Sequence, residues 1–248
     1  FDMKTGSVVW DVAIDDYKLG YSATAAPLIV KDKVVVGIAG AEYGIRGFIA
    51  AYDVATGLLT RPAFEKRVQA ILTDEALRSD NSVIYLDIDR LHVLNENFGM
   101  HVGDEVIVRV ADIIRRSLTP RVLAARVSGD RFALYVGDAT LDTAQGIAEN
   151  LRDAISRLGF VAGARPVDVT ASFGVARVSD GKRPLPHALA VAEIACKAAK
   201  DRGRNRVEIF EDSDHSIMRR FTDVTLVGTL REALALNRFR LDAQPIVA

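Results

Sequence analysis

The hydrophobic pattern of this chain changes abruptly near residue 57, and this change constrains the fold more than any other feature. Before it, short β-like runs (SVVW, PLIV, KVVVGI and GFIAAY) are separated by Gly, Pro, Asp and Lys, with no helical period. After it, amphipathic helical stripes alternate with short apolar runs. We therefore predict an all-β segment followed by an α/β (α+β) unit in which helices cover a central sheet.

The second part contains predicted helices at 64–72, 106–118, 144–158 and about 186–201. Predicted strands lie at 83–89, 126–136 (a hairpin), 167–178 and 206–210. The run VIYLDID at 83–89 is almost continuously apolar before its acids, which is typical of a strand buried on both faces. The run at 167–178 alternates, which predicts one face formed by Val167, Val169, Ala171, Phe173 and Val175.

A short repeat marks the all-β segment. FDMKTG at 1–6 recurs as YDVATG at 52–57, so that Asp2 and Asp53 lie 51 positions apart. This period fits one four-stranded blade of a β-propeller. Trp10 stands four positions after the first repeat and Arg61 after the second, so we expect the repeat to end at about Gly57.

Charge and composition exclude several classes. The net charge of −1 provides no overall field for nucleic acid or an anionic membrane, and no apolar run approaches the roughly 18 residues of a membrane span. The single cysteine, Cys196, lies in the alanine-rich run AVAEIACKAAK, which favours a small core residue over a nucleophile.

Two acids are the first candidates for a site. Asp87 ends a buried strand, and Asp130 stands at the tip of the hairpin RVSGDRFALYV, which we expect beside that strand. Two converging carboxylates are the minimum for holding Mg²⁺, which brings nucleotide phosphates with it. Two unrelated surface acids are the alternative on these residues alone.

Five blocks resemble the GGDEF domain, the diguanylate cyclase fold that joins two GTP molecules into cyclic di-GMP. They are LLTRPAFEKRV, DIDRLHVLNENFGMHVGDEVIVRVA, RVSGDRFALYVG, VTASFGVA and AEIACKAAKDRGRNRV. The resemblance covers about 55–210, and we assign 55–212 to this domain. It implies a five-stranded sheet wrapped by helices, related to adenylyl cyclases.

The resemblance also implies roles for individual residues. It makes Asp87, the carbonyl of Ile88 and Asp130 the Mg²⁺ ligands. It assigns Asn95 and Asp104 to guanine, whose edge suits an amide and a carboxylate. It assigns Lys200 and Arg204 to the phosphates, although cations at a solvated helix end are the alternative.

Four departures from the family pattern bear on activity. Ser128 replaces the first signature glycine and Arg131 replaces the signature glutamate, so no catalytic residue is assigned. A cation about 4 Å from a bound cation is repelled by about 4 kcal/mol at an effective dielectric of 20. His92 replaces a phosphate-binding lysine, and 119–122 reads TPRV where the inhibitory Arg-x-x-Asp motif belongs. Product feedback is therefore not expected.

These departures favour a degenerate GGDEF domain that binds GTP, with Mg²⁺, but does not cyclise it efficiently. An active diguanylate cyclase with a variant motif, working as a homodimer, is the alternative, and an interaction scaffold without GTP affinity is a third. The family implies a cytoplasmic location.

Both ends resemble other families. LREALALNRFRLDAQPIVA resembles the start of the EAL phosphodiesterase domain, so we expect 213–248 to be a linker and its truncated first elements, or a packed extension. Residues 1–54 resemble a blade of the periplasmic quinoprotein (PQQ) alcohol dehydrogenases, with Thr24 matching a cofactor contact and Glu42 a Ca²⁺ ligand. The other ligands of that family are absent, so PQQ and Ca²⁺ are not expected to bind. A dehydrogenase fragment and an artificial fusion both remain open.

Overall fold

The computed structural model describes residues 2, 4–14, 18, 20–23, 25–39, 47–73, 80–178 and 184–210. The chain divides into two compact units, 1–210 and 211–248, and the second lies outside the described residues together with the predicted EAL-like tail. Within the described ranges, no helix combines the length and apolar character needed to cross a bilayer.

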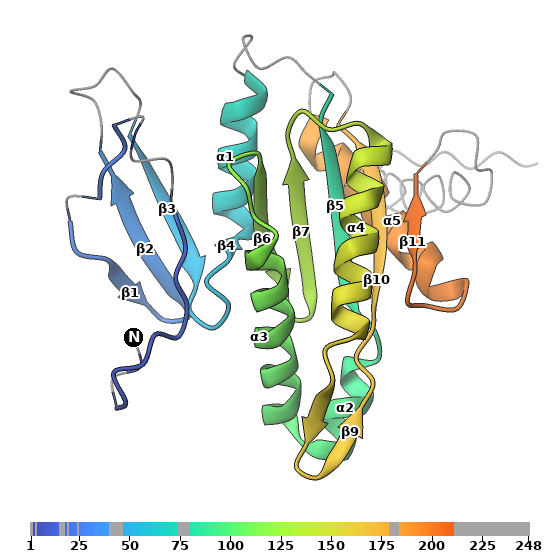
Figure 1. Cartoon of the computed structure of the whole chain (residues 1–248). Coiled ribbons are helices and arrows are strands. Elements are labelled where there is room, and N and C mark those ends of the chain that lie inside the picture. Colours follow the sequence, from blue (N-terminus) through green and yellow to red (C-terminus); the bar gives the residue numbers. More distant parts are fainter. Residues whose placement is uncertain are drawn as a thin grey trace, which may run out of the picture. The chain divides into compact units, whose positions relative to one another are not determined.

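A nine-stranded sheet in the order β1-β2-β3-β4-β6-β7-β5-β10-β11 forms the centre of the first unit (Figure 1). Its strands are β1 Leu28–Val30, β2 Lys33–Ile38, β3 Phe48–Asp53, β4 Leu59–Thr60, β5 Ser82–Ile88, β6 Val122–Ser128, β7 Arg131–Val136, β10 Ala171–Arg177 and β11 Val207–Ile209. The helices are α1 Arg61–Thr73, α2 Leu91–Phe98, α3 Met100–Arg116, α4 Leu141–Ser156 and α5 Pro184–Asp201. The predicted helix-covered sheet is confirmed.

Two helix layers enclose the central strands. Helices α3 and α4 contact each other, and α4 packs on β5 and β10, whereas α5 packs on the same two strands and also contacts α1. Figure 1 shows α3 and α4 in front of the sheet. Every residue of β5 is buried, as the apolar run at 83–89 predicts. Side chains of α5 therefore lie close to β5.

Helix α5 lies unusually close to the sheet, and its sequence explains why. A Cβ atom added at Gly174 of β10 would overlap the carbonyl oxygen of Ala192 and the amide nitrogen of Cys196. The small alanine side chains of α5 and the absent side chain at 174 permit this approach. Cys196 is 2% exposed and its Sγ donates to the Ser172 carbonyl at 3.1 Å, so its predicted core position is confirmed.

Some local predictions are wrong. The run at 167–178 is not one alternating strand, because β9 (Arg165–Val167) pairs with β8 (Phe160–Ala162) in a separate hairpin and β10 begins only at Ala171. Nearly all of β10 is buried, since helices cover both of its faces. The run SVVW at 7–10 forms no strand, and α2 was not anticipated.

The two copies of the Asp-x-x-Thr-Gly repeat adopt the same conformation. Thr5 Oγ1 donates to Asp2 Oδ1 at 2.9 Å, and Thr56 Oγ1 donates to Asp53 Oδ1 at 2.7 Å. Gly6 and Gly57 have φ angles of 69° and 67°, and each N–H donates to its aspartate carbonyl at 2.8 Å. The same residues therefore close the same turn in both copies.

The second turn also joins the two parts of the chain. Tyr52 of β3 pairs with Leu59 of β4, and β4 then runs parallel to β6. Arg126 of β6 forms an ion pair with Asp53 at 3.3 Å. The β1–β3 strands are thus continuous with the central sheet, which extends beyond the five strands implied by the family resemblance.

Candidate functional site

The predicted acids meet where β5 ends and the β6–β7 hairpin turns. Asp87 lies opposite Arg131 in the antiparallel β5–β7 ladder, and Ile88 donates its N–H to the Asp130 carbonyl at 3.2 Å. Gly129 takes a φ of 49°, a left-handed conformation that glycine adopts without strain in a two-residue turn. The structure therefore brings Asp87, Ile88 and Asp130 together, as the sequence predicts.

Asp87 is held by two cations. Lys200 Nζ lies 2.6 Å from its Oδ1 and Arg131 Nε lies 3.5 Å from its Oδ2. Burial raises the pKa of Asp87 above that of an exposed aspartate; Lys200 opposes this shift, and the neighbouring Asp130 adds to it. The carboxylate is therefore costly to keep charged and depends on these cations.

Arg131 is itself anchored from the opposite helix. Its Nη1 lies 3.5 Å from Glu193 Oε1 on α5, one face of which also carries Lys200. Burial raises the pKa of nearby Tyr85 to about 12, so that this residue remains a neutral phenol beside the guanidinium. Glu193 was missed by sequence reasoning, because only packing of α5 on the sheet brings it to residue 131.

Asp89 is a second residue that sequence reasoning missed. It is 6% exposed; its Oδ1 accepts from Ser172 Oγ at 2.7 Å and its Oδ2 accepts from Thr170 Oγ1 at 2.9 Å. Oδ2 also accepts from the Asn205 N–H at 3.1 Å. Asp89 thereby holds the loop after α5 in place. Its position as the second acid of the DID motif is the sequence feature that could have identified it.

The predicted guanine pair lies at the α2–α3 corner. Asn95 on α2 packs against Gly103 of α3, the neighbour of Asp104, so the two predicted residues lie close together. A Cβ atom at residue 103 would overlap Asn95 Oδ1. This oxygen is buried and accepts no hydrogen bond within the described part of the chain, while Asp104 is exposed. In this conformation Asn95 Oδ1 therefore faces the α2–α3 contact, and Asp104 is the solvent-accessible acceptor of the pair.

Three further positions that sequence analysis singled out are solvent-accessible. Arg204 is exposed in the loop after α5, where a φ of 65° and an N–H bond to the Ala199 carbonyl at 3.0 Å shape the chain. His92 on α2 and Ser128 at the end of β6 are also exposed. Thr24 and Glu42 lie outside the described residues.

The side chains at the β5 end do not form a ready metal site. Asp87 and Asp130 supply oxygen atoms of the kind Mg²⁺ prefers. However, both Asp87 oxygens already face cations, and Arg131 occupies the space beside them. Within the described ranges, no group of three or more His, Cys, Asp or Glu side chains adds further ligands to these two acids. The geometry present therefore does not fit a divalent cation.

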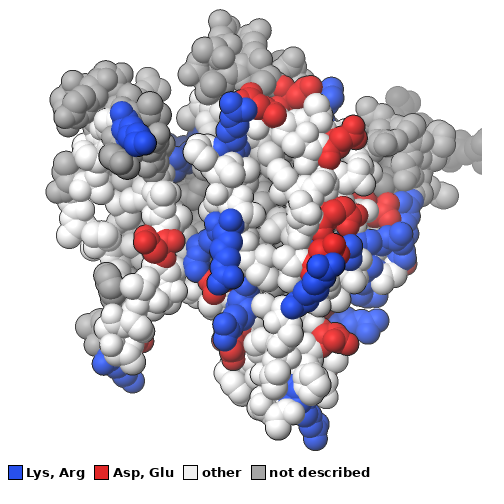
Figure 2. Space-filling view, in the orientation of Figure 1, with Lys and Arg blue, Asp and Glu red and all other residues white. Residues whose placement is uncertain are grey.

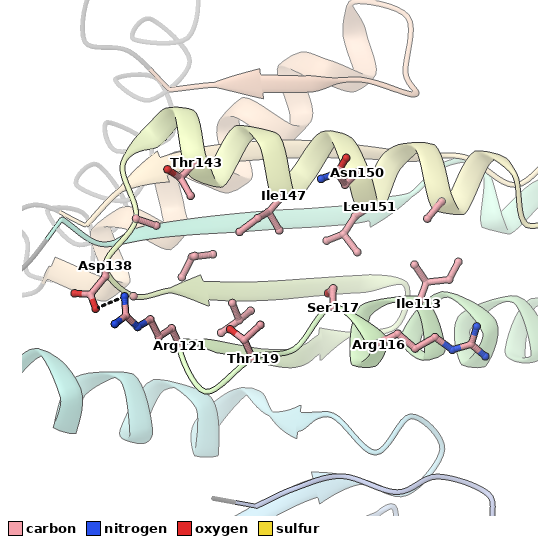
Figure 3. A pocket seen from close by; sticks show the side chains of 15 residues that line it. Ile113, Arg116, Ser117, Thr119, Arg121, Asp138, Thr143, Ile147, Asn150 and Leu151 are labelled. Atoms are coloured by element: carbon pink, nitrogen blue, oxygen red, sulfur yellow. Dashed lines mark ion pairs between the residues drawn. The ribbon is translucent and has the colours of Figure 1, made fainter. Parts of the chain in front are cut away.

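A pocket lies away from these residues, between α3, α4, the start of β6 and the end of β7 (Figure 3). It has a volume of about 580 Å³, with Ile113, Ile147 and Leu151 among its apolar lining. Thr119 lies on its wall, where the family's inhibitory motif has arginine, and Arg121 is paired with Asp138 at 3.0 Å. Arg116, which is exposed, also belongs to this lining.

The surface charges give no further candidate on the face drawn in Figure 2. Basic and acidic side chains lie interspersed there, without a continuous stripe of one sign.

Comparisons with known proteins agree with this architecture. The family model described as "Diguanylate cyclase, GGDEF domain" matches residues 50–206. Among solved structures, the GGDEF domain of DgcB from Caulobacter crescentus in complex with c-di-GMP is similar with a TM-score of 0.59 and 29% identity. That similarity covers 64% of this chain and 92% of the DgcB chain.

Two curated proteins show further similarity to this chain. The bifunctional diguanylate cyclase/cyclic di-GMP phosphodiesterase MucR from Pseudomonas aeruginosa is 30% identical over 202 residues, which are 80% of this chain and 29% of MucR. The chain therefore spans less than a third of this relative. Subunit 1 of the methanol dehydrogenase from Methylorubrum extorquens is 54% identical over 54 residues, 22% of this chain and 9% of the dehydrogenase.

Proposed function

The chain belongs to the diguanylate cyclase GGDEF domain family, and on this basis we propose that residues 55–212 are a guanine-nucleotide-binding regulatory domain of cyclic di-GMP signalling that does not cyclise GTP efficiently. The observation that carries the proposal is the Arg131–Asp87 ion pair at 3.5 Å. A guanidinium occupies the signature position of a glutamate, and the acid expected to hold the reactive cation is already neutralised. In this proposal the domain works in the cytoplasm, where GTP is available.

The purine-binding half supports retained binding. Asn95 Oδ1 has no hydrogen-bond partner within the described residues, and Asp104 is exposed close by. Rotation of the Asn95 amide would present its oxygen to a donor of guanine, while Asp104 accepts from the same base edge. Lys200 and the exposed Arg204 supply positive charge for the phosphates, which lie beyond the base.

The reactive half supports the loss of cyclisation. Cyclisation needs a 3′-hydroxyl of one GTP to attack the α-phosphate of another, so negative charge must be stabilised and two nucleotides must be aligned. Arg131 removes a carboxylate from this point, Ser128 adds a side chain to the turn, and His92 replaces the ammonium group of a lysine by an imidazole ring. In this proposal these three changes leave recognition of a single nucleotide as the function of the domain.

The enzymatic alternative is an active diguanylate cyclase that works as a homodimer. Incubation of the purified protein with GTP and Mg²⁺, followed by chromatography for cyclic di-GMP, separates the two. We expect no product above background, and an increase in the double variant Arg131→Glu, His92→Lys. Rapid product formation by the unchanged protein would refute the proposal.

Calorimetric titration with GTP tests binding itself. We expect saturable binding of GTP and weaker binding of ATP, because adenine lacks the donors that Asn95 and Asp104 accept. A protein without affinity for either nucleotide would instead fit the scaffold alternative.

We further propose that 213–248 begin an EAL domain. MucR, whose name includes a phosphodiesterase activity, matches 202 residues of this chain, which is more than the GGDEF family model covers. In a longer protein, GTP binding would then tune the phosphodiesterase through a coupling of about 1–3 kcal/mol. Hydrolysis of cyclic di-GMP by the longer protein, measured with and without GTP, tests this coupling.

Residues 1–54 are proposed to be a propeller-blade remnant without catalytic function. The methanol dehydrogenase match supports this origin, and so does the exposure of Leu28, Ile29 and Ile49, at 62%, 69% and 65%. In a closed propeller such apolar faces pack against neighbouring blades. PQQ and Ca²⁺ binding are not part of this proposal, and a natural or artificial fusion would leave the same strands exposed.

A further inference from the structure

The cations at the β5 end occupy the atoms that a metal would need. Lys200 Nζ lies 2.6 Å from Asp87 Oδ1, and Arg131 Nε lies 3.5 Å from Asp87 Oδ2. Mg²⁺ binds carboxylate oxygens directly, at about 2.0–2.1 Å and with near-octahedral geometry. A metal ion at Asp87 would therefore have to displace one of these side chains.

Arg131 is not free to leave. Its backbone is fixed in the β7 ladder opposite Asp87, and its Nη1 lies 3.5 Å from Glu193 Oε1 on α5. Carboxylates thus hold the guanidinium from the sheet on one side and from the helix on the other. Its side chain nevertheless remains 45% exposed, so that an incoming phosphate can reach it.

Arginine at position 131 makes the local charge balance less favourable for a divalent cation and less repulsive for phosphates. Three carboxylates (Asp87, Asp130 and Glu193) face two cations (Arg131 and Lys200), which leaves a net charge of −1. With glutamate at 131 the same cluster would carry −3. A divalent ion gains much less from the first arrangement than from the second.

We infer that Arg131 and Lys200 take the place of the metal, so that this domain binds the phosphates of a guanine nucleotide without Mg²⁺. The inference rests on the proposed nucleotide binding and adds its metal independence. A guanidinium forms paired hydrogen bonds with phosphate oxygens, and it is always charged. Lys200 adds a point charge from the same side.

Two measurements on the full chain test this inference. In calorimetry we expect GTP affinity in EDTA and in Mg²⁺ to agree within about threefold, a difference of less than 1 kcal/mol. In Mn²⁺ titrations followed by electron paramagnetic resonance, without nucleotide, we expect no binding by the unchanged protein. The variant Arg131→Glu should bind Mn²⁺ and lose at least about tenfold in GTP affinity in EDTA.

A matched control makes the same charge change elsewhere. Arg121→Glu alters an arginine whose side chain is 70% exposed and paired with Asp138, and it should leave both measurements unchanged. If Arg131→Glu does not fold, as judged by circular dichroism, Arg131→Gln tests the loss of GTP affinity in EDTA.

The outcomes separate this inference from the proposed function. GTP binding that requires Mg²⁺, or Mn²⁺ binding by the unchanged protein, would overturn the inference and leave nucleotide binding intact. Failure to bind GTP with or without Mg²⁺ would overturn the proposed function and this inference with it.

Discussion

Gly103 offers the sharpest test of guanine recognition, because one added methyl group acts on a single contact. A Cβ atom at this position would overlap Asn95 Oδ1 and would lie 2.9 Å from Asn95 Cγ and 3.2 Å from Nδ2. Ordinary contacts between such atoms are about 3.5–4.0 Å. The variant Gly103→Ala therefore forces the Asn95 amide of α2 away from its position against α3.

Two opposite effects follow from this substitution. Gly103 lies inside α3, where alanine is intrinsically favoured over glycine by about 0.8–1.0 kcal/mol. Displacement of Asn95 removes one hydrogen-bond partner from the bound base, which costs about 1–3 kcal/mol, or about 5- to 150-fold in affinity. We therefore expect unchanged or higher thermal stability together with weaker GTP binding.

The assay is calorimetric titration with GTP, combined with thermal unfolding of the same samples. Gly146→Ala is the matched control, because Gly146 lies inside α4 and an added Cβ atom there meets nothing within 4 Å. This control should gain similar stability and keep its affinity. Equal GTP affinity in Gly103→Ala, Gly146→Ala and the unchanged protein would refute the role given to Asn95.

Three further changes test the sheet, the charged site and the β segment. Gly174→Ala should destabilise the protein by about 3 kcal/mol or more in urea unfolding, because the new Cβ overlaps backbone atoms of α5; a loss below 1 kcal/mol would contradict this close packing. Asp87→Asn should be more stable than the unchanged protein at pH 7 but not below about pH 4. The raised pKa of buried Asp87 means that its favourable protonated form is lost as the pH rises, and a stability difference between the two proteins that does not change with pH would argue against this. Trp10→Ala removes an indole that lies against Gly57 and donates to the Val54 carbonyl at 2.7 Å. We expect faster amide hydrogen exchange in β2 and β3 with little change in GTP affinity, whereas unchanged exchange would show that Trp10 does not hold these strands.

Local sequence patterns predicted the order of the main elements. The helices at α1, α3, α4 and α5, the buried strand β5 and the tight β6–β7 hairpin all follow from periodicity and turn residues. The same patterns misled at 167–178, because alternation identifies one apolar face and says nothing about a helix that buries the other. Helix α2 was missed, because a helix of only eight residues shows little periodicity.

Sequence predicted some contacts of the candidate site, and only the structure shows the others. The proximity of Asp87 and Asp130 could be predicted from sequence, because Asp87 lies at the end of a strand and Asp130 lies in the turn of the neighbouring hairpin. The ion pair between Arg131 and Glu193 could not be predicted, because 62 positions separate these residues along the chain. The burial of Asn95 Oδ1 against Gly103 likewise depends on how α2 meets α3.

The sequence by itself determined the fold class, the family, and the exchange of an acid for a base at residue 131, because these depend on residue identity and local spacing. Only the tertiary structure decided that this base pairs with Asp87 while Lys200 pairs with the other oxygen of the same carboxylate. The physical reason is the close approach of α5 to β10 over Gly174, which brings Lys200 and Glu193 of this helix within ion-pair distance of Asp87 and Arg131 on the neighbouring strands β5 and β7. That approach is a property of packing, which no stretch of local sequence contains.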